Sequence, residues 1–108
     1  MNVFDLDALE RFDADKMAKV DLTASPHMIC GLNCFAPGQT QKAHAHKGAD
    51  KLYVVVKGSG EFSVGAERRT LSAGQALHVP EEIEHGVSNP SADQPLVVLI
   101  VIAPNVHG

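Results

Sequence analysis

Short apolar segments, each ended by a turn rich in glycine or proline, recur at intervals of about 8–12 residues along most of this chain. No segment with helical periodicity between them is long enough to cover a sheet. Chains with this pattern form all-β sandwiches or barrels, because the turns return each short strand beside an earlier one. We therefore predict strands at residues 16–22, 27–35, 52–56, 61–64, 68–71, 75–79 and 96–102.

The two ends of the chain differ from this middle part. Phe4, Leu6, Leu9 and Phe12 have approximately helical spacing, so a short helical or irregular arm is expected there. The segment 96–102 (LVVLIVI) is apolar throughout, which predicts a strand buried on both faces, against the core and against a partner subunit. We expect an N-terminal arm over residues 1–15 and a single barrel domain over residues 16–108.

The charge and the cysteines limit the classes of function. The net charge is −4 and no cluster of Lys and Arg offsets it, so neither a nucleic acid nor an anionic membrane is an expected partner. No apolar run approaches the roughly 20 residues that span a bilayer, and the acidic N-terminus is not a secretory signal. Cys30 and Cys34 lie about 13 Å apart in an extended strand, too far to pair with each other. We interpret them as small core side chains of a reduced, cytoplasmic protein.

Three histidines are candidates for a metal site. His44 and His46 are two residues apart, so in extended backbone both imidazoles point to one face. His85 follows the turn at Pro80 and is the candidate third ligand from another strand. Neutral imidazoles suit zinc, nickel, copper and iron(II), and three protein ligands leave positions for water and substrate.

These histidines lie inside two longer patterns. In the first, Gly38 precedes His44 by five intervening residues and Gly58 closes the segment after His46. In the second, four residues have a regular spacing: Gly74, Pro80, His85 and Asn89. Together the two patterns resemble the two sequence motifs of the cupin superfamily, in particular its small single-domain members.

The resemblance implies a fold, a cofactor and partners. The fold would be a small antiparallel β-barrel or jelly roll, the cupin double-stranded β-helix. A divalent transition metal (Zn, Ni, Fe, Mn or Cu) would be held by His44, His46 and His85. A small-molecule ligand would lie inside the barrel, and the protein would be a homodimer to which residues 96–102 contribute a strand.

Two positions depart from the family pattern. Glu82 replaces the middle glycine of the second motif, so we expect a looser turn after Pro80. Lys51 stands where the family usually carries a glutamate ligand, and Asp50 is one position early. Since faces alternate along a strand, only one of the two points inward unless the strand bulges, and the family register favours Lys51.

A lysine at this position changes the electrostatics of a metal site. A protonated Lys51 about 5 Å from a divalent ion would be repelled by roughly 6–7 kcal/mol at an effective dielectric constant near 20. Either Lys51 is neutral or it swings out of the site. Otherwise the metal is weakly held or absent.

These features favour a metal-dependent enzyme, an oxygenase, isomerase or lyase acting on a small polar substrate. Lys51 and Tyr53 are the candidate catalytic residues: Lys51 as a carboxylate-holding cation or a base, and Tyr53 as a hydrogen-bond donor or a wall residue. The alternative is a non-enzymatic cupin that binds or senses a small ligand with a weak or empty metal site. A purely structural oligomerisation module would be supported only by the apolar final strand.

The remaining histidines are weaker candidates. His78, two residues before Pro80, is either a polar group facing the cavity or a strand histidine packed at the mouth of the barrel. His27 and His107 are expected to be exposed to solvent.

Overall fold

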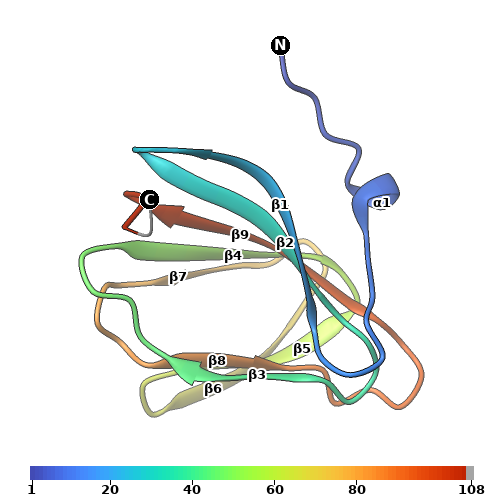
Figure 1. The fold of residues 1–108 in the computed structure, drawn as a ribbon. Coiled ribbons are helices and arrows are strands. Elements are labelled where there is room, and N and C mark those ends of the chain that lie inside the picture. Colours follow the sequence, from blue (N-terminus) through green and yellow to red (C-terminus); the bar gives the residue numbers. More distant parts are fainter. Residues whose placement is uncertain (107–108) are drawn as a thin grey trace.

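The computed structural model describes residues 1–106, and nearly all of its regular structure is β-strand (Figure 1). One short helix, α1 (Leu6–Leu9), lies in the N-terminal arm. None of the described residues forms a helix long and apolar enough to cross a bilayer. The strands are β1 (Ala18–Ser25), β2 (Met28–Phe35), β3 (Thr40–His44), β4 (Asp50–Lys57), β5 (Ser59–Val64), β6 (Glu67–Ser72), β7 (Ala76–Val79), β8 (His85–Ser88) and β9 (Leu96–Ala103).

The strands form two antiparallel sheets that pack face to face (Figure 1). One sheet has the order β1-β2-β9-β4-β7 and the other the order β3-β8-β5-β6. Aromatic and branched aliphatic side chains from both sheets fill the space between them, with Phe35, Tyr53 and Phe62 among the largest. The predicted all-β barrel or jelly roll, with a short helix in its N-terminal arm, is confirmed.

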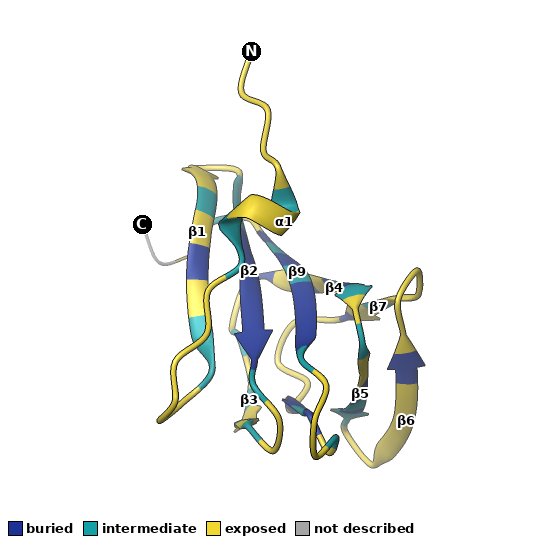
Figure 2. Ribbon diagram, turned by 90° about the vertical axis from the view of Figure 1, so that its right-hand side faces the viewer, coloured by how far each residue is buried: buried dark blue, intermediate teal, exposed yellow. Residues whose placement is uncertain are grey.

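The position of β9 explains why its residues are apolar on both faces. It runs between β2 and β4, and its Leu96, Val98 and Ile100 belong to the core between the sheets. Val97, on the opposite face, belongs to a second cluster that also contains side chains of β1 and β2. α1 of the same chain packs against this cluster and covers it, as the position of α1 beside β2 and β9 in Figure 2 indicates. A partner subunit is therefore not needed to bury the outer face of β9, and the homodimer stays a prediction.

Three strands differ from the sequence-based expectation, and one of them, β8, is absent from the predicted strands. β1 extends three residues beyond the predicted end at residue 22 and reaches Ser25, with a register shift against β2 between Asp21 and Thr23. β3 was not predicted at all, because its sequence, TQKAH, lacks an apolar alternation. It is an edge strand that pairs with β8 on one side only, so few of its side chains are buried.

The turn after Pro80 keeps the backbone conformation that the missing glycine would adopt. Glu82 has φ = 66°, in the left-handed region that glycine enters without strain. Its N–H donates to the carbonyl oxygen of His46 at 2.8 Å, so the turn holds the histidine loop in place. The structure thus keeps both the left-handed backbone at residue 82 and this hydrogen bond, and the looser turn stays a prediction.

Replacing Glu82 with Gly is expected to raise the free energy of unfolding by about 0.5–1 kcal/mol, because glycine removes the Cβ penalty of a positive φ. Urea unfolding followed by circular dichroism measures the change. Glu84→Gly is the matched control: its φ is not positive, so the substitution should lower stability by about 0.5–1 kcal/mol. If Glu82→Gly and Glu84→Gly changed the free energy of unfolding by the same amount and in the same direction, the backbone of Glu82 would not be strained.

Candidate metal centre

The pairing of β3 with β8 brings the three histidines together. His44, at the end of β3, is the direct partner of His85, at the start of β8. His46 follows in the loop after β3. The ring centroids lie 4.3 Å apart for His44 and His85, 4.9 Å for His44 and His46, and 5.4 Å for His46 and His85. One ring nitrogen of each residue lies within 4.8 Å of the others, so a single ion could contact all three.

Backbone carbonyls set the tautomers of two of these rings. Nδ1 of His44 lies 3.0 Å from the carbonyl oxygen of Lys42, and Nδ1 of His85 lies 2.8 Å from that of Ile83. A carbonyl oxygen only accepts, so each Nδ1 carries the proton and each Nε2 keeps its lone pair. Nε2 of His85 is buried and has no hydrogen-bond partner among the described residues. Orientation of the ring through the second nitrogen is typical of histidine metal ligands, and the residues fit an ion at this point.

Burial keeps the imidazoles in the form that binds metal. It lowers the pKa of His44 and of His85, and the charge of Lys51 lowers both further. The carbonyl contacts of the two Nδ1 atoms raise these pKa values in part, since they favour the protonated ring. Both rings are therefore neutral at pH 7.

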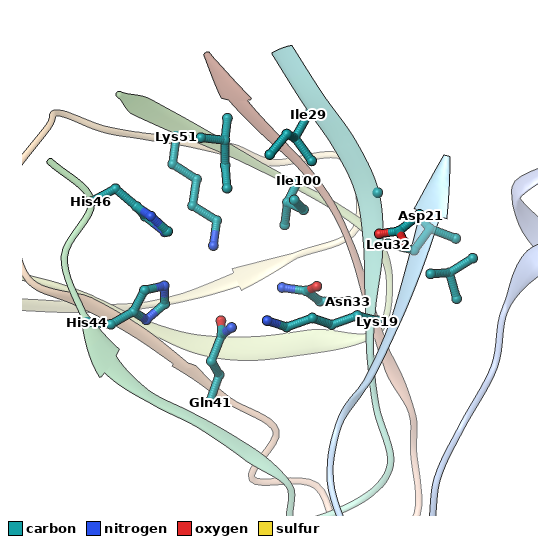
Figure 3. Close-up of a pocket in the computed structure, with 13 residues that line it drawn as sticks. Lys19, Asp21, Ile29, Leu32, Asn33, Gln41, His44, His46, Lys51 and Ile100 are labelled. Atoms are coloured by element: carbon teal, nitrogen blue, oxygen red, sulfur yellow. The ribbon is translucent and has the colours of Figure 1, made fainter. Parts of the chain in front are cut away.

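Lys51, and not Asp50, points into the interior. Lys51 is only 4% exposed, and its side chain extends into the cavity beside His46 (Figure 3). Asp50 faces solvent, where its carboxylate accepts the N–H of Glu81 at 3.0 Å and pairs with Nε2 of His78 at 2.9 Å. The two neighbours alternate across β4, so the position of the usual glutamate ligand is occupied by an ammonium group.

No carboxylate among the described residues neutralises Lys51. Its Nζ lies 4.6 Å from the centroid of the Tyr53 ring, over the face of the aromatic system. Burial, followed by the charge of Lys19, lowers the pKa of Lys51 to about 8. The lysine is therefore still mainly protonated at pH 7, but it releases its proton far more readily than a surface lysine.

Tyr53 packs behind Lys51. It is 1% exposed, its ring contacts those of Phe62 and His85, and its hydroxyl has no hydrogen-bond partner among the described residues. Burial raises its pKa above the ordinary value. Tyr53 is not among the residues that line the cavity, and its catalytic role stays a prediction.

His78 lies outside the cavity. Its neighbour Val79 faces the core, so alternation along β7 turns His78 outward to its ion pair with Asp50. The interpretation of His78 as a polar group inside the cavity is wrong. His27 is exposed to solvent, and His107 lies outside the described residues. The thiols of Cys30 and Cys34 are free, and Cys34 is buried in the cluster under α1.

His44 and His46 line one side of a cavity of about 380 Å³, whereas His85 lies behind them and is not among its lining residues. Sequence analysis missed four polar residues that line it: Lys19 and Asp21 on β1, Asn33 on β2 and Gln41 on β3. Lys19 and Asn33 are direct partners across β1 and β2, and the side chains of Lys19, Asn33 and Gln41 point toward the space in front of His44 (Figure 3). Asn33 could have been identified from the sequence, because it is the one amide within an otherwise apolar strand. In the structure it is only 3% exposed. The sequence around Lys19 and around Gln41 has no feature that would have identified these residues.

Replacing Lys51 with Met is expected to raise the free energy of unfolding at pH 7 by about 1–3 kcal/mol, because a buried charge is removed while the volume is kept. The unfolded chain binds the proton with a pKa of 10.5 and the folded chain with a pKa of about 8, so the wild-type protein loses stability as the pH falls through this window. The advantage of the variant should therefore shrink toward pH 10.5 and stay constant below pH 8. Urea unfolding between pH 7 and pH 10.5 measures it, with the exposed Lys16→Met as control. An advantage that does not depend on pH would contradict a buried cation.

Comparison with known proteins gives related chains and structures. Uncharacterized protein SCO3923 of Streptomyces coelicolor is 34% identical over 107 residues, which cover 96% of this chain and 97% of the relative. Dimethylsulfoniopropionate lyase DddW of Ruegeria pomeroyi is 32% identical over 59 residues, 55% of this chain and 38% of the lyase. Among solved structures, TT1209 from Thermus thermophilus is 40% identical in sequence to this chain. The two structures match with a TM-score of 0.91, and the match covers 96% of this chain and 98% of that chain.

The sequence model of the cupin domain matches residues 31–102. The matched segment runs from β2 into β9 and contains His44, His46 and His85. The match covers more than half of the chain and agrees with the two motifs and with the observed fold. This chain belongs to the cupin family.

Proposed function

We propose that this protein binds one divalent transition metal ion through His44, His46 and His85, and that it acts on a small polar molecule bound in the adjoining cavity. The observation that carries the proposal is the buried Nε2 of His85. It has a lone pair but no hydrogen-bond partner among the described residues, and it lies among the ring nitrogens of the other two histidines. Leaving such an atom without a partner is costly, and an ion would satisfy it.

The closeness of the three rings supports the same conclusion. One ring nitrogen of each histidine lies within 4.8 Å of the others, so a single ion could contact all three. Three protein ligands leave positions at the ion for water and substrate. Imidazole ligands suit zinc, nickel, copper and iron(II), and manganese is a further candidate.

The chemistry divides between the ion and the lysine. A bound divalent ion supplies a Lewis acid that polarises a substrate oxygen or lowers the pKa of a water molecule. In the metal-free protein the pKa of Lys51 is about 8, and the charge of a bound ion would lower it further, so Nζ can donate or accept a proton close to neutral pH. An oxygenase, an isomerase and a lyase all use such groups, and the relative named as a lyase favours the third class.

The replacement of a carboxylate ligand by Lys51 favours a second candidate, a cupin that binds or senses a small ligand without metal chemistry. An ammonium group beside the histidines weakens the hold on an ion. This candidate needs the cavity but no bound ion, so metal content separates the two functions.

Protein purified without chelators is expected to contain about one transition metal ion per chain, measured by inductively coupled plasma mass spectrometry. His44→Ala and His85→Ala should each lower the affinity by more than about 100-fold, because each removes a direct ligand. His78→Ala is the matched control, since His78 lies outside the cavity and should leave the metal content unchanged. Substoichiometric metal at every loading would refute the metal-dependent enzyme.

Metal should be released as the pH falls through about 6, because protons then compete for the histidine nitrogens. The pKa values of His44 and His85 are lowered in the metal-free protein, so competition begins at a lower pH than for exposed histidines. Metal content after dialysis against buffers from pH 8 to pH 4.5 measures the release. Full occupancy at pH 4.5 would contradict histidine ligation.

A further inference from the structure

Two lysines without an ion-pair partner among the described residues, Lys19 and Lys51, line the cavity beside the histidines. Lys51 is a buried residue, and Lys19 extends from β1 toward Gln41 on the opposite side of the same space (Figure 3). Asp21 is the one acidic residue among those that line the cavity, and Figure 3 places it on the far side from His44 and His46. The inner part of the cavity is therefore positively charged.

An amide group lies between the two lysines. Asn33 is 3% exposed, and its side-chain amide points into the cavity beside Lys19 (Figure 3). Gln41 also lines the cavity, and its buried Oε1 has no hydrogen-bond partner among the described residues. Buried polar groups are normally satisfied, so a ligand with both accepting and donating atoms, or water bound with it, would complete them.

The remaining wall of the cavity is apolar. Ile29 of β2 and Ile100 and Ile102 of β9 line it, and Figure 3 shows Ile29 and Ile100 above the amide of Asn33. A ligand that fills the whole space would therefore need a hydrocarbon part beside its charged group.

We propose that the cavity binds a small aliphatic carboxylic acid, with the carboxylate between Lys51, Lys19 and Asn33 and the hydrocarbon part against the three isoleucines. This names the substrate class of the function proposed above and rests on that function for its link to the metal. The buried ammonium group of Lys51 carries the inference: its burial is unfavourable in the free protein, and an anionic ligand supplies the missing counter-charge.

A carboxylate fits this cavity better than the other small anions. Inorganic phosphate and phosphate monoesters carry at least three terminal oxygen atoms that need several donors, and proteins usually supply them from helix N-termini or arginines. The cavity is lined by neither, and its lining donors are the ammonium groups of Lys19 and Lys51, the amides of Asn33 and Gln41, and the two histidines. Its isoleucine wall has no role in binding a compact, fully polar ion.

Butyrate is a suitable probe, with butanamide as its uncharged isostere and inorganic phosphate as the competing anion. Binding is measured by calorimetry on the full chain, both metal-loaded and after removal of metal with EDTA. In the metal-free protein, butyrate should bind at least about tenfold more tightly than butanamide, because charge-assisted hydrogen bonds are stronger than neutral ones. Lengthening acetate to butyrate should tighten binding by up to about fourfold per methylene group buried on the isoleucines.

Three lysine variants locate the carboxylate. Lys51→Met and Lys19→Met should each weaken butyrate binding by about tenfold or more, while the exposed Lys16→Met leaves it unchanged. Lys19 is exposed, so its variant remains informative even if a change at Lys51 alters folding. Equal affinity for butyrate and butanamide, no effect of Lys51→Met and Lys19→Met, or tighter binding of phosphate than of butyrate would each overturn the proposal.

Metal content measured in the same samples separates the two hypotheses. Metal bound at the histidines without butyrate binding would refute the carboxylic acid and leave the proposed metal site standing. Butyrate binding that depends on the two lysines, in a protein that takes up no metal, would support the carboxylic acid and refute the metal-dependent function.

Discussion

The site depends on the antiparallel pairing of β3 with β8. This pairing sets His44 directly opposite His85, although the two residues are far apart in sequence. Because side chains alternate along a strand, a shift of one residue in this register would turn one of the two rings away. The hydrogen bond from the N–H of Glu82 to the carbonyl oxygen of His46 then fixes the loop that carries the third ring. Two sets of backbone hydrogen bonds thus determine whether three imidazoles converge.

The second feature of the site is the positive charge of Lys51 in the interior. Lys51 projects from β4 between the sheets and lies near imidazoles, an aromatic ring and a second lysine, and no carboxylate of the described residues forms an ion pair with it. A core of this size gains stability by excluding charges, so an unpaired ammonium group works against folding. Functional sites commonly retain such unfavourable groups because their chemistry needs them. The metal and the anionic ligand proposed here both follow from polar groups that the fold itself leaves unsatisfied.

Much of the architecture could be predicted from the order of apolar segments and turns. β2, β4 to β7 and β9 lie close to their predicted positions, since their apolar periodicity reflects burial in this fold. β3 could not be predicted, because an edge strand with polar side chains has no periodic signal. The apolar sequence of β9 suggested a subunit contact, whereas α1 of the same chain covers its outer face. Sequence periodicity reports that a face is buried but not which part of the molecule buries it.

For the site, the sequence by itself determined that His44, His46 and His85 belong to two recognisable motifs and that a glutamate ligand is missing. Only the tertiary structure decided that Lys51 points inward while Asp50 pairs with His78 on the surface. β4 has apolar residues on both faces, so its hydrophobic pattern could not select one register. The contributions of Lys19, Asn33 and Gln41 were equally hidden, because they come from three strands whose neighbours are set by the packing of the sheets and not by spacing along the chain.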